Sequence, residues 1–97
     1  MIIELKKFGT TLVSRQSGKE AWAAFQPVLG SVSVAEDVTL DFAGVITFSP
    51  SWGDEFITPL QEKYQERLIL KNTSNSSVQA TLRLLEEISK IKFKLVK

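Results

Sequence analysis

The sequence contains neither cysteine nor histidine. Without cysteine the chain can form no disulfide, no thiolate metal site and no cysteine nucleophile. Histidine is the usual general acid and base near neutral pH and the commonest metal ligand. Catalysis would therefore depend on carboxylates, lysines, hydroxyl groups or Tyr64. Because a glycine-rich phosphate loop is also missing, we expect a protein that is not an enzyme and uses no metal and no cofactor.

Long apolar runs and a strong net charge are lacking as well. No run approaches the roughly 20 apolar residues that span a bilayer, and the first residues do not form a basic segment followed by an apolar one, as a secretion signal would. The net charge is only +1, which gives no general attraction to nucleic acid or to anionic membranes. We expect a cytoplasmic protein that does not bind membranes.

The remaining composition is that of a small globular domain. Hydrophobic residues make up 43% and charged residues 24% of the 97 residues, so the chain has enough apolar surface to build one modest core. The sequence contains no repeat and no linker. We therefore expect residues 1–97 to form a single domain.

Hydrophobic periodicity predicts strands that alternate with helices. In chain order, we expect a hairpin or bent edge strand over residues 2–13, a helix over 17–29, and a strand over 38–42 that residues 43–44 break or bend before an apolar segment over 45–48. A helix over 52–64, a strand over 67–71 and a helix over 78–88 follow. This order predicts an α/β fold in which a mixed β-sheet of about four to five strands has about three helices packed against it.

Local signals refine three of these segments. Ser17 and Glu20 have the spacing of a capping box, which predicts the start of the first helix. Thr58, followed by Pro59, resembles a second cap, so we expect the helix over 52–64 to kink or to restart there. Residues 91–97 alternate between lysine and apolar residues and form a basic tail, an extension of the last helix, or a terminal strand. Such a strand would also permit strand exchange in a homodimer.

Two short motifs carry a resemblance to a known family. Residues 40–45 read Leu-Asp-Phe-Ala-Gly-Val, and residues 48–52 read Phe-Ser-Pro-Ser-Trp. This pair resembles the core motif of the STAS domains, which include the anti-sigma factor antagonists. Their strand ends in Asp, an apolar residue, a small residue, Gly and Val, and Asp-Ser-Ser-Gly follows at the start of a helix. The whole chain resembles a divergent bacterial subgroup, the STAS-like domains of unknown function, with which it also shares Phe8-Gly9, Ser14-Arg15 and Leu70-Lys71-Asn72. The resemblance implies a STAS-like fold and a regulatory module from a bacterium or phage.

The resemblance also singles out one serine. In the antagonists, an ATP-binding anti-sigma kinase phosphorylates the second serine of Asp-Ser-Ser-Gly, and this modification ends binding. The spacing places Ser51 at that position, whereas Ser49 stands at the Asp, Pro50 at the first Ser and Trp52 at the Gly. Because a bulky side chain replaces glycine next to the hydroxyl, phosphorylation of Ser51 is a hypothesis here.

The residues around Ser51 also allow a purely structural interpretation. A serine at the N-cap accepts a hydrogen bond from a free backbone N–H, and the helix dipole there favours a phosphate. Ser51 could therefore serve as cap and switch together, or only as a cap with Asp54 as its partner. Asp54 and Glu55 are adjacent, so we interpret them as first-turn acids and not as a catalytic pair. Trp52 could lie at the rim as an interface anchor, or pack in the core with Phe56.

The sequence therefore predicts a non-catalytic regulatory module that binds a protein. By resemblance, its partner would be a histidine-kinase-like ATPase or another anti-sigma-type regulator. Asp41 is expected to anchor the following loop through hydrogen bonds, or to contribute to the partner site. The expected partner-binding residues are Ser49, Pro50, Ser51, Trp52, Asp54 and Glu55.

The alternative is a small nucleic-acid-associated protein that uses the lysine-rich C-terminus. Lysines cluster near the end of the chain, at Lys90, Lys92, Lys94 and Lys97. Such a cluster is usually a solvated face, and the low net charge favours protein binding over nucleic-acid binding.

Overall fold

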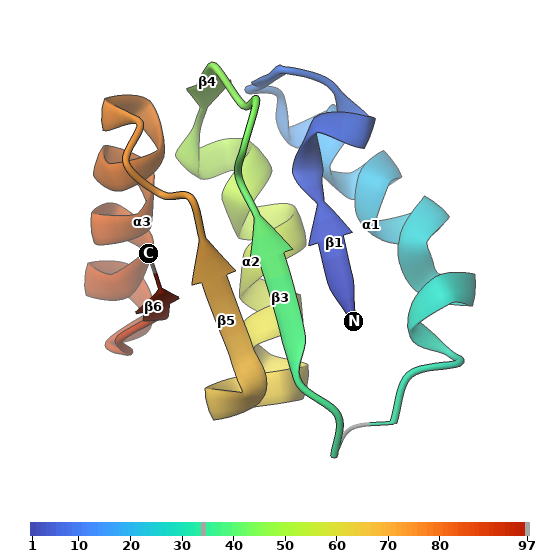
Figure 1. Ribbon diagram of the computed structural model, residues 1–97. Coiled ribbons are helices and arrows are strands. Elements are labelled where there is room, and N and C mark those ends of the chain that lie inside the picture. Colours follow the sequence, from blue (N-terminus) through green and yellow to red (C-terminus); the bar gives the residue numbers. More distant parts are fainter. Residues whose placement is uncertain (34, 97) are drawn as a thin grey trace.

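The computed structural model describes residues 1–33 and 35–96 and contains a parallel β-sheet and three helices, with α2 behind the sheet and α1 and α3 on either side of it (Figure 1). The sheet order is β1-β3-β5-β6, and all of its strand pairs are parallel. A second, two-stranded parallel sheet joins β2 and β4. The strands are β1 (Ile2–Glu4), β2 (Thr11–Leu12), β3 (Val38–Asp41), β4 (Thr47–Phe48), β5 (Leu68–Lys71) and β6 (Lys94–Val96). The helices are α1 (Arg15–Leu29), α2 (Pro50–Tyr64) and α3 (Ser76–Ser89), with short 3₁₀ helices η1 (Leu5–Phe8) and η2 (Gln65–Arg67).

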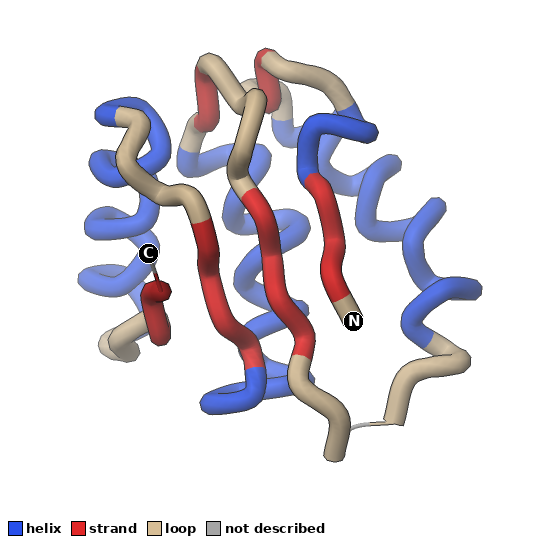
Figure 2. Tube along the Cα trace, in the orientation of Figure 1, coloured by secondary structure: helices blue, strands red, loops and turns tan. Residues whose placement is uncertain are grey.

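The predicted α/β fold class is confirmed, with two differences in the strands. The sheet is parallel and not mixed. Of the two alternatives predicted for residues 2–13, the hairpin is wrong, because β1 pairs with β3 and β2 pairs with β4. β1 is an edge strand of the sheet. Leu5 is fully buried, so the chain leaves β1 through η1 into the core instead of reversing on itself. Figure 2 shows β1, β3 and β5 running side by side with helices behind them.

The first two helices begin earlier than predicted. Ser14 is the N-cap of α1, and its Oγ accepts a hydrogen bond from the Ser17 N–H at 3.0 Å, so the predicted cap at Ser17 is wrong. The predicted cap at Ser51 is wrong as well, because Ser49 caps α2 and accepts from the Trp52 N–H at 3.4 Å. Pro50 explains this choice, since proline fits the first helical position, where its missing N–H loses no helical bond.

Helix α2 runs without interruption through Pro59, so the predicted alternative of a second helix is wrong. Proline removes one helical hydrogen bond, but the helix carries a long buried stripe on both sides of that position. The stripe comprises Trp52, Phe56, Ile57, Leu60 and Tyr64. Burial of this stripe against the sheet and the neighbouring helices holds the helix together where its backbone ladder is weakest.

Trp52 lies in the core, so the prediction that it could anchor a partner at the rim is wrong. Its side chain is 0% exposed and stacks on Phe56 with ring centroids 5.0 Å apart. Phe8 and Phe48 contact it from other elements, at 6.1 and 5.9 Å between centroids. This aromatic cluster fixes the first turn of α2 against the rest of the molecule.

Two glycines allow α2 to approach its neighbours. A Cβ on Gly18 of α1 would lie 2.9 Å from the Trp52 carbonyl oxygen, and a Cβ on Gly53 would lie 2.9 Å from Leu85 of α3. Neither position has room for a larger residue unless its neighbours move. Helix α2 is therefore held between α1 and α3.

Of the alternatives predicted for residues 91–97, the structure shows a terminal strand. Lys94 to Val96 form β6, which pairs with β5; Lys97 lies outside the described residues. Phe93 is buried and its N–H donates to Glu86 Oε2 at 2.8 Å, so α3 itself positions the strand. Within the described residues, no helix combines the length and apolar character needed to cross a membrane.

Candidate functional site

Salt bridges from one arginine to two carboxylates join the N-terminal parts of α1 and α2. Arg15 Nη1 donates to Glu55 Oε2 at 2.6 Å and to Asp54 Oδ2 at 3.1 Å. The hydrogen bonds to Asp54 and then to Glu55 raise the pKa of the Arg15 guanidinium above its ordinary value. Both carboxylates therefore face a permanent positive charge from α1. The first turn of α2 holds no acidic residue, so the prediction that Asp54 and Glu55 are first-turn acids is wrong.

Ser51 lies on the same face of α2 as these carboxylates. The spacings of three and four residues from Ser51 to Asp54 and Glu55 make them neighbours on a helix, and all three side chains are partly exposed. Thr58 extends the face by donating to Asp54 Oδ1 at 3.2 Å. We call the group of Arg15, Ser51, Asp54, Glu55 and Thr58 the Ser51 surface. It offers hydroxyls, carboxylates and one guanidinium on a rigid helix.

Ser49 and Pro50 mainly support this surface. The Ser49 hydroxyl donates to the Val13 carbonyl at 2.6 Å and accepts from Trp52 N–H. It therefore joins the segment before α1 to the start of α2. Pro50, also partly exposed, occupies the first helical position beside Ser51. Of the six predicted partner-binding residues, the structure brings Ser51, Asp54 and Glu55 together on one accessible face, and buries Trp52.

Asp41 lies at the end of β3 and bonds to two loops. Its Oδ1 accepts from the Ala43 N–H at 2.9 Å and from Asn72 Nδ2 at 2.7 Å. The hydrogen bond from Asn72, followed by that from Ala43, lowers the pKa of the carboxyl group, and the charges of Lys71 and Lys6 add to the effect. These are the contacts expected of a loop anchor. They go to the loops after β3 and β5, and not to the Ser51 surface.

The segment that leads into α2 is fixed from α3. Thr81 Oγ1 donates to the Phe48 carbonyl at 2.6 Å, and Ser77 Oγ bonds to both the N–H and the carbonyl of Phe48. Asn75 caps α3 and donates to the Val45 and Ile46 carbonyls. These hydrogen bonds fix β4 against α3, and β4 in turn fixes the position of Ser49 and Ser51 at the start of α2.

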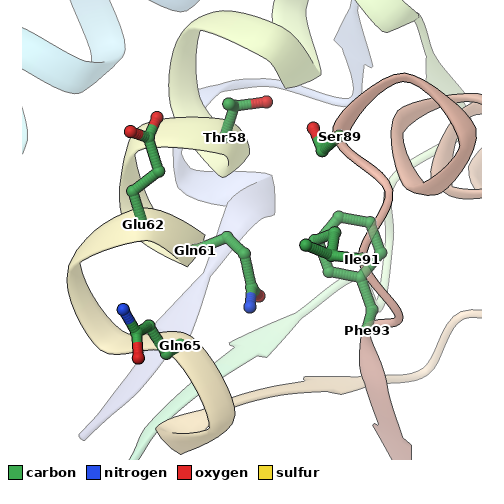
Figure 3. Close-up of a pocket in the computed structure, with 7 residues that line it drawn as sticks. All are labelled: Thr58, Gln61, Glu62, Gln65, Ser89, Ile91 and Phe93. Carbon is green, nitrogen blue, oxygen red and sulfur yellow. The ribbon is translucent and has the colours of Figure 1, made fainter.

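A groove follows the C-terminal half of α2 (Figure 3). Its volume is about 480 Å³, and it lies between α2 and the segment that connects α3 to β6. The Gln61 side chain points from α2 into it, and its Oε1 is buried with no hydrogen-bond partner among the described residues. Thr58 belongs to both the groove and the Ser51 surface. The lining residues are Thr58, Gln61, Glu62, Gln65, Ser89, Ile91 and Phe93.

The contacts of Arg15 and Thr58 at this surface and the groove were not predicted from the sequence. Arg15 is 39 residues from Asp54 in the chain, and no local pattern signals such a pairing. The groove also joins two distant segments. The only sequence feature that pointed to the groove is the four-residue spacing of Gln61 and Gln65, which is the spacing of neighbours on one face of a helix.

Among residues 1–33 and 35–96, no group of three or more His, Cys, Asp or Glu side chains lies close enough together to hold a metal ion. The Ser51 surface has two carboxylates, and both already bind Arg15. Its chemistry is therefore that of hydrogen bonding and ion pairing.

Comparison with known protein families gives a match over the middle of the chain. A family described as "STAS-like domain of unknown function (DUF4325)" has a model that matches residues 26–78, which is more than half of the chain. The match runs from the end of α1 into the start of α3 and includes both Asp41 and Ser51. No curated protein and no solved structure matches the chain.

Proposed function

The chain belongs to the family of STAS-like domains of unknown function, and on that premise we propose that it is a non-catalytic regulatory module that docks a protein partner through the Ser51 surface. The observation that carries the proposal is the position of Ser51, Asp54 and Glu55 on the open side of a helix whose other side is buried. Such a face can bind without rearrangement, so little conformational entropy is lost on binding. The absence of histidine and cysteine from the sequence supports a non-catalytic role.

The proposal includes a switch at Ser51. This residue occupies the second position of α2, where backbone N–H groups have no acceptor within the helix and the dipole favours negative charge. A phosphate there would add about 1.5 to 2 negative charges. Asp54 and Glu55 lie one turn away, and Arg15 is the cation that contacts both. Phosphorylation would therefore make the surface strongly acidic and end docking to a partner that binds the unmodified form.

The partner proposed by family resemblance is a histidine-kinase-like ATPase that acts as an anti-sigma factor or related regulator. Such a partner would supply the nucleotide, for which this chain has no glycine-rich phosphate loop. A bacterial or phage protein working in the cytoplasm fits this role. The groove beside Thr58 continues the docking surface toward the C-terminal end of α2.

Affinity purification of the full chain from its host tests the proposal, with mass spectrometry of both the bait and its partners. Wild-type protein is expected to retain the ATPase, and Ser51→Glu is expected to lose it. Ser76→Glu is the matched control, because Ser76 is also exposed in the first turn of a helix. A phosphate on Ser51 of the bait would support the switch.

Three results would contradict parts of the proposal. Equal recovery of the ATPase by Ser51→Glu and wild type would remove the Ser51 surface from the interface. An unmodified Ser51 in the presence of the ATPase and ATP would leave a binding module without this switch. Recovery of nucleic acid alone, lost at moderate salt, would favour the lysine-rich C-terminus as the binding site.

A further inference from the structure

Within residues 1–33 and 35–96, nothing covers one face of the β1-β3-β5-β6 sheet. Each crossover moves one strand in the same direction across the sheet, and parallel crossovers are right-handed, so all three helices lie on the same side. Figure 1 shows α2 behind the strands, with α1 and α3 on either side of it. Parallel sheets almost always have both faces covered. The opposite face of this sheet is therefore a surface that is available to a partner.

Strand register gives the residues of this bare face. Neighbours in register point to the same side, and in β1, β3 and β5 the alternate residues are more exposed than those facing the helices. All three residues of β6 are exposed. Ile2 is 62% and Val96 41% exposed, at opposite edges. Two rows cross the face: Ile2, Thr39, Ile69 and Lys94, and then Glu4, Asp41, Lys71 and Val96.

The charges of the bare face are divided between its two halves. Glu4 and Asp41 lie on β1 and β3, whereas Lys71 and Lys94 lie on β5 and β6. Lys6, from η1, reaches the acidic half and pairs with Glu4 at 3.7 Å. The strand order therefore places acid on one side of the sheet centre and base on the other, with apolar side chains in both halves.

We propose that the bare face binds a second copy of this chain about a twofold axis that runs parallel to the strands, between β3 and β5. This rotation places β1 over the partner's β6 and β3 over the partner's β5. Asp41 then faces the partner's Lys71, and Glu4 comes within diagonal reach of the partner's Lys94. An axis perpendicular to the strands would place each strand over itself, acid over acid and base over base. Charge complementarity therefore selects the parallel axis.

The size of the face limits the strength of this dimer. Four strands at about 4.8 Å spacing, each three or four residues long at about 3.3 Å per residue, cover roughly 20 by 12 Å. Stable interfaces bury about 800 Å² per partner. The dimer is consequently weak, and because exposed ion pairs contribute to it, high salt weakens it further. The face lies on the other side of the sheet from α2, so dimerisation leaves the Ser51 surface free.

Sedimentation equilibrium of the full chain at low salt tests the proposal with two charge reversals. Wild type is expected to dimerise reversibly as its concentration rises. Glu4→Lys opposes two cations across the interface and Lys94→Glu opposes two carboxylates, so each variant alone is expected to dimerise at least about tenfold more weakly.

A 1:1 mixture of the two variants restores both pairings. In the mixed dimer, the lysine introduced at position 4 meets the glutamate introduced at position 94. The native Lys94 of the first variant likewise meets the native Glu4 of the second. The mixture is therefore expected to form a heterodimer with near wild-type affinity.

Glu87→Lys is the matched control, because it reverses an exposed charge on α3, away from the face. Circular dichroism checks that all variants are folded. The proposal is overturned if wild type stays monomeric up to millimolar concentration at low salt, if neither reversal weakens the dimer, or if mixing the two variants fails to restore it.

Discussion

Arg15 Nη1 lies 2.6 Å from Glu55 Oε2, and this contact joins the first turn of α1 to the second turn of α2. The same nitrogen reaches Asp54 at 3.1 Å. One guanidinium therefore holds two adjacent carboxylates on the face that carries Ser51. The ion pair sets the charge of this face, and its removal changes what a partner meets there.

Replacement of Arg15 by Gln is expected to change partner binding more than folding. The ion pair is exposed to solvent, so its loss has little effect on the free energy of unfolding. The freed carboxylates make the Ser51 surface more acidic, as a phosphate on Ser51 would, so docking of the partner is expected to weaken. Urea denaturation and calorimetric titration of the purified partner measure the two effects. A large drop in stability with unchanged binding would show that Arg15 has only a structural role.

Gly18→Ala is expected to destabilise the fold by about 1 to 3 kcal/mol, although alanine is the better helix former. The new Cβ would lie 2.9 Å from the backbone oxygen of Trp52, which cannot move without shifting α2. Gly30→Ala is the matched control, because its nearest contact is at 3.5 Å and its φ is −61°. Urea midpoints measure both changes. Equal effects of the two substitutions would contradict the close packing of α1 on α2.

Asp41→Asn is expected to lower stability at pH 7 by about 1 kcal/mol, because it weakens hydrogen bonds to a charged acceptor. The hydrogen bonds from Asn72 and Ala43 lower the pKa of Asp41 in the folded state. Its stabilisation is thus fully present above the unfolded pKa of about 3.9 and is lost as the pH falls through the lower folded value. The difference between wild type and variant should shrink below about pH 4. Urea denaturation from about pH 7 to about pH 2.5 covers this range. Asp37→Asn is the control. A stability difference between wild type and Asp41→Asn that does not change with pH would contradict the prediction.

Gln61→Leu is expected to raise the free energy of unfolding by about 1 kcal/mol. Its buried Oε1 has no hydrogen-bond partner within the described part of the chain, and leucine of similar size removes this unpaired acceptor while adding apolar contact with Ile91 and Phe93. Gln65→Leu, at the exposed end of the groove, is the control and should change stability little. Thermal denaturation compares the two. A loss of stability in Gln61→Leu would contradict the prediction and show that the Gln61 amide makes hydrogen bonds that stabilise the fold more than apolar contact does.

Helices and strands were predicted correctly where a single pattern of apolar residues determines the element. Val78, Leu82 and Leu85 recur at helical spacing, and all three are buried in α3. In the same way, alternation in residues 38–42 predicted β3. These features depend on residues a few positions apart, which a single sequence contains in full.

Pairing and exact helix starts could not be read in this way. Both Ser49 and Ser51 fit an N-cap, and only the preference of Pro50 for the first helical position favours Ser49. The partner of β1 is β3, more than 30 residues later, so local turn signals favoured a hairpin that does not form. The burial of Trp52 depends on Phe8 and Phe48 from other elements, and the ion pair of Arg15 is equally non-local.

The order of strands across the sheet is the order in which a ribosome makes them. Each new strand can therefore join the open edge left by the strands already synthesised, with no need to insert between two earlier ones. Since chains are made from the N-terminus and fold as they emerge, a nascent chain that has reached Lys71 already contains α2 and both strands that flank it. Assembly of this domain can then proceed in one direction, and β6 completes the sheet after α2 and its Ser51 surface have formed.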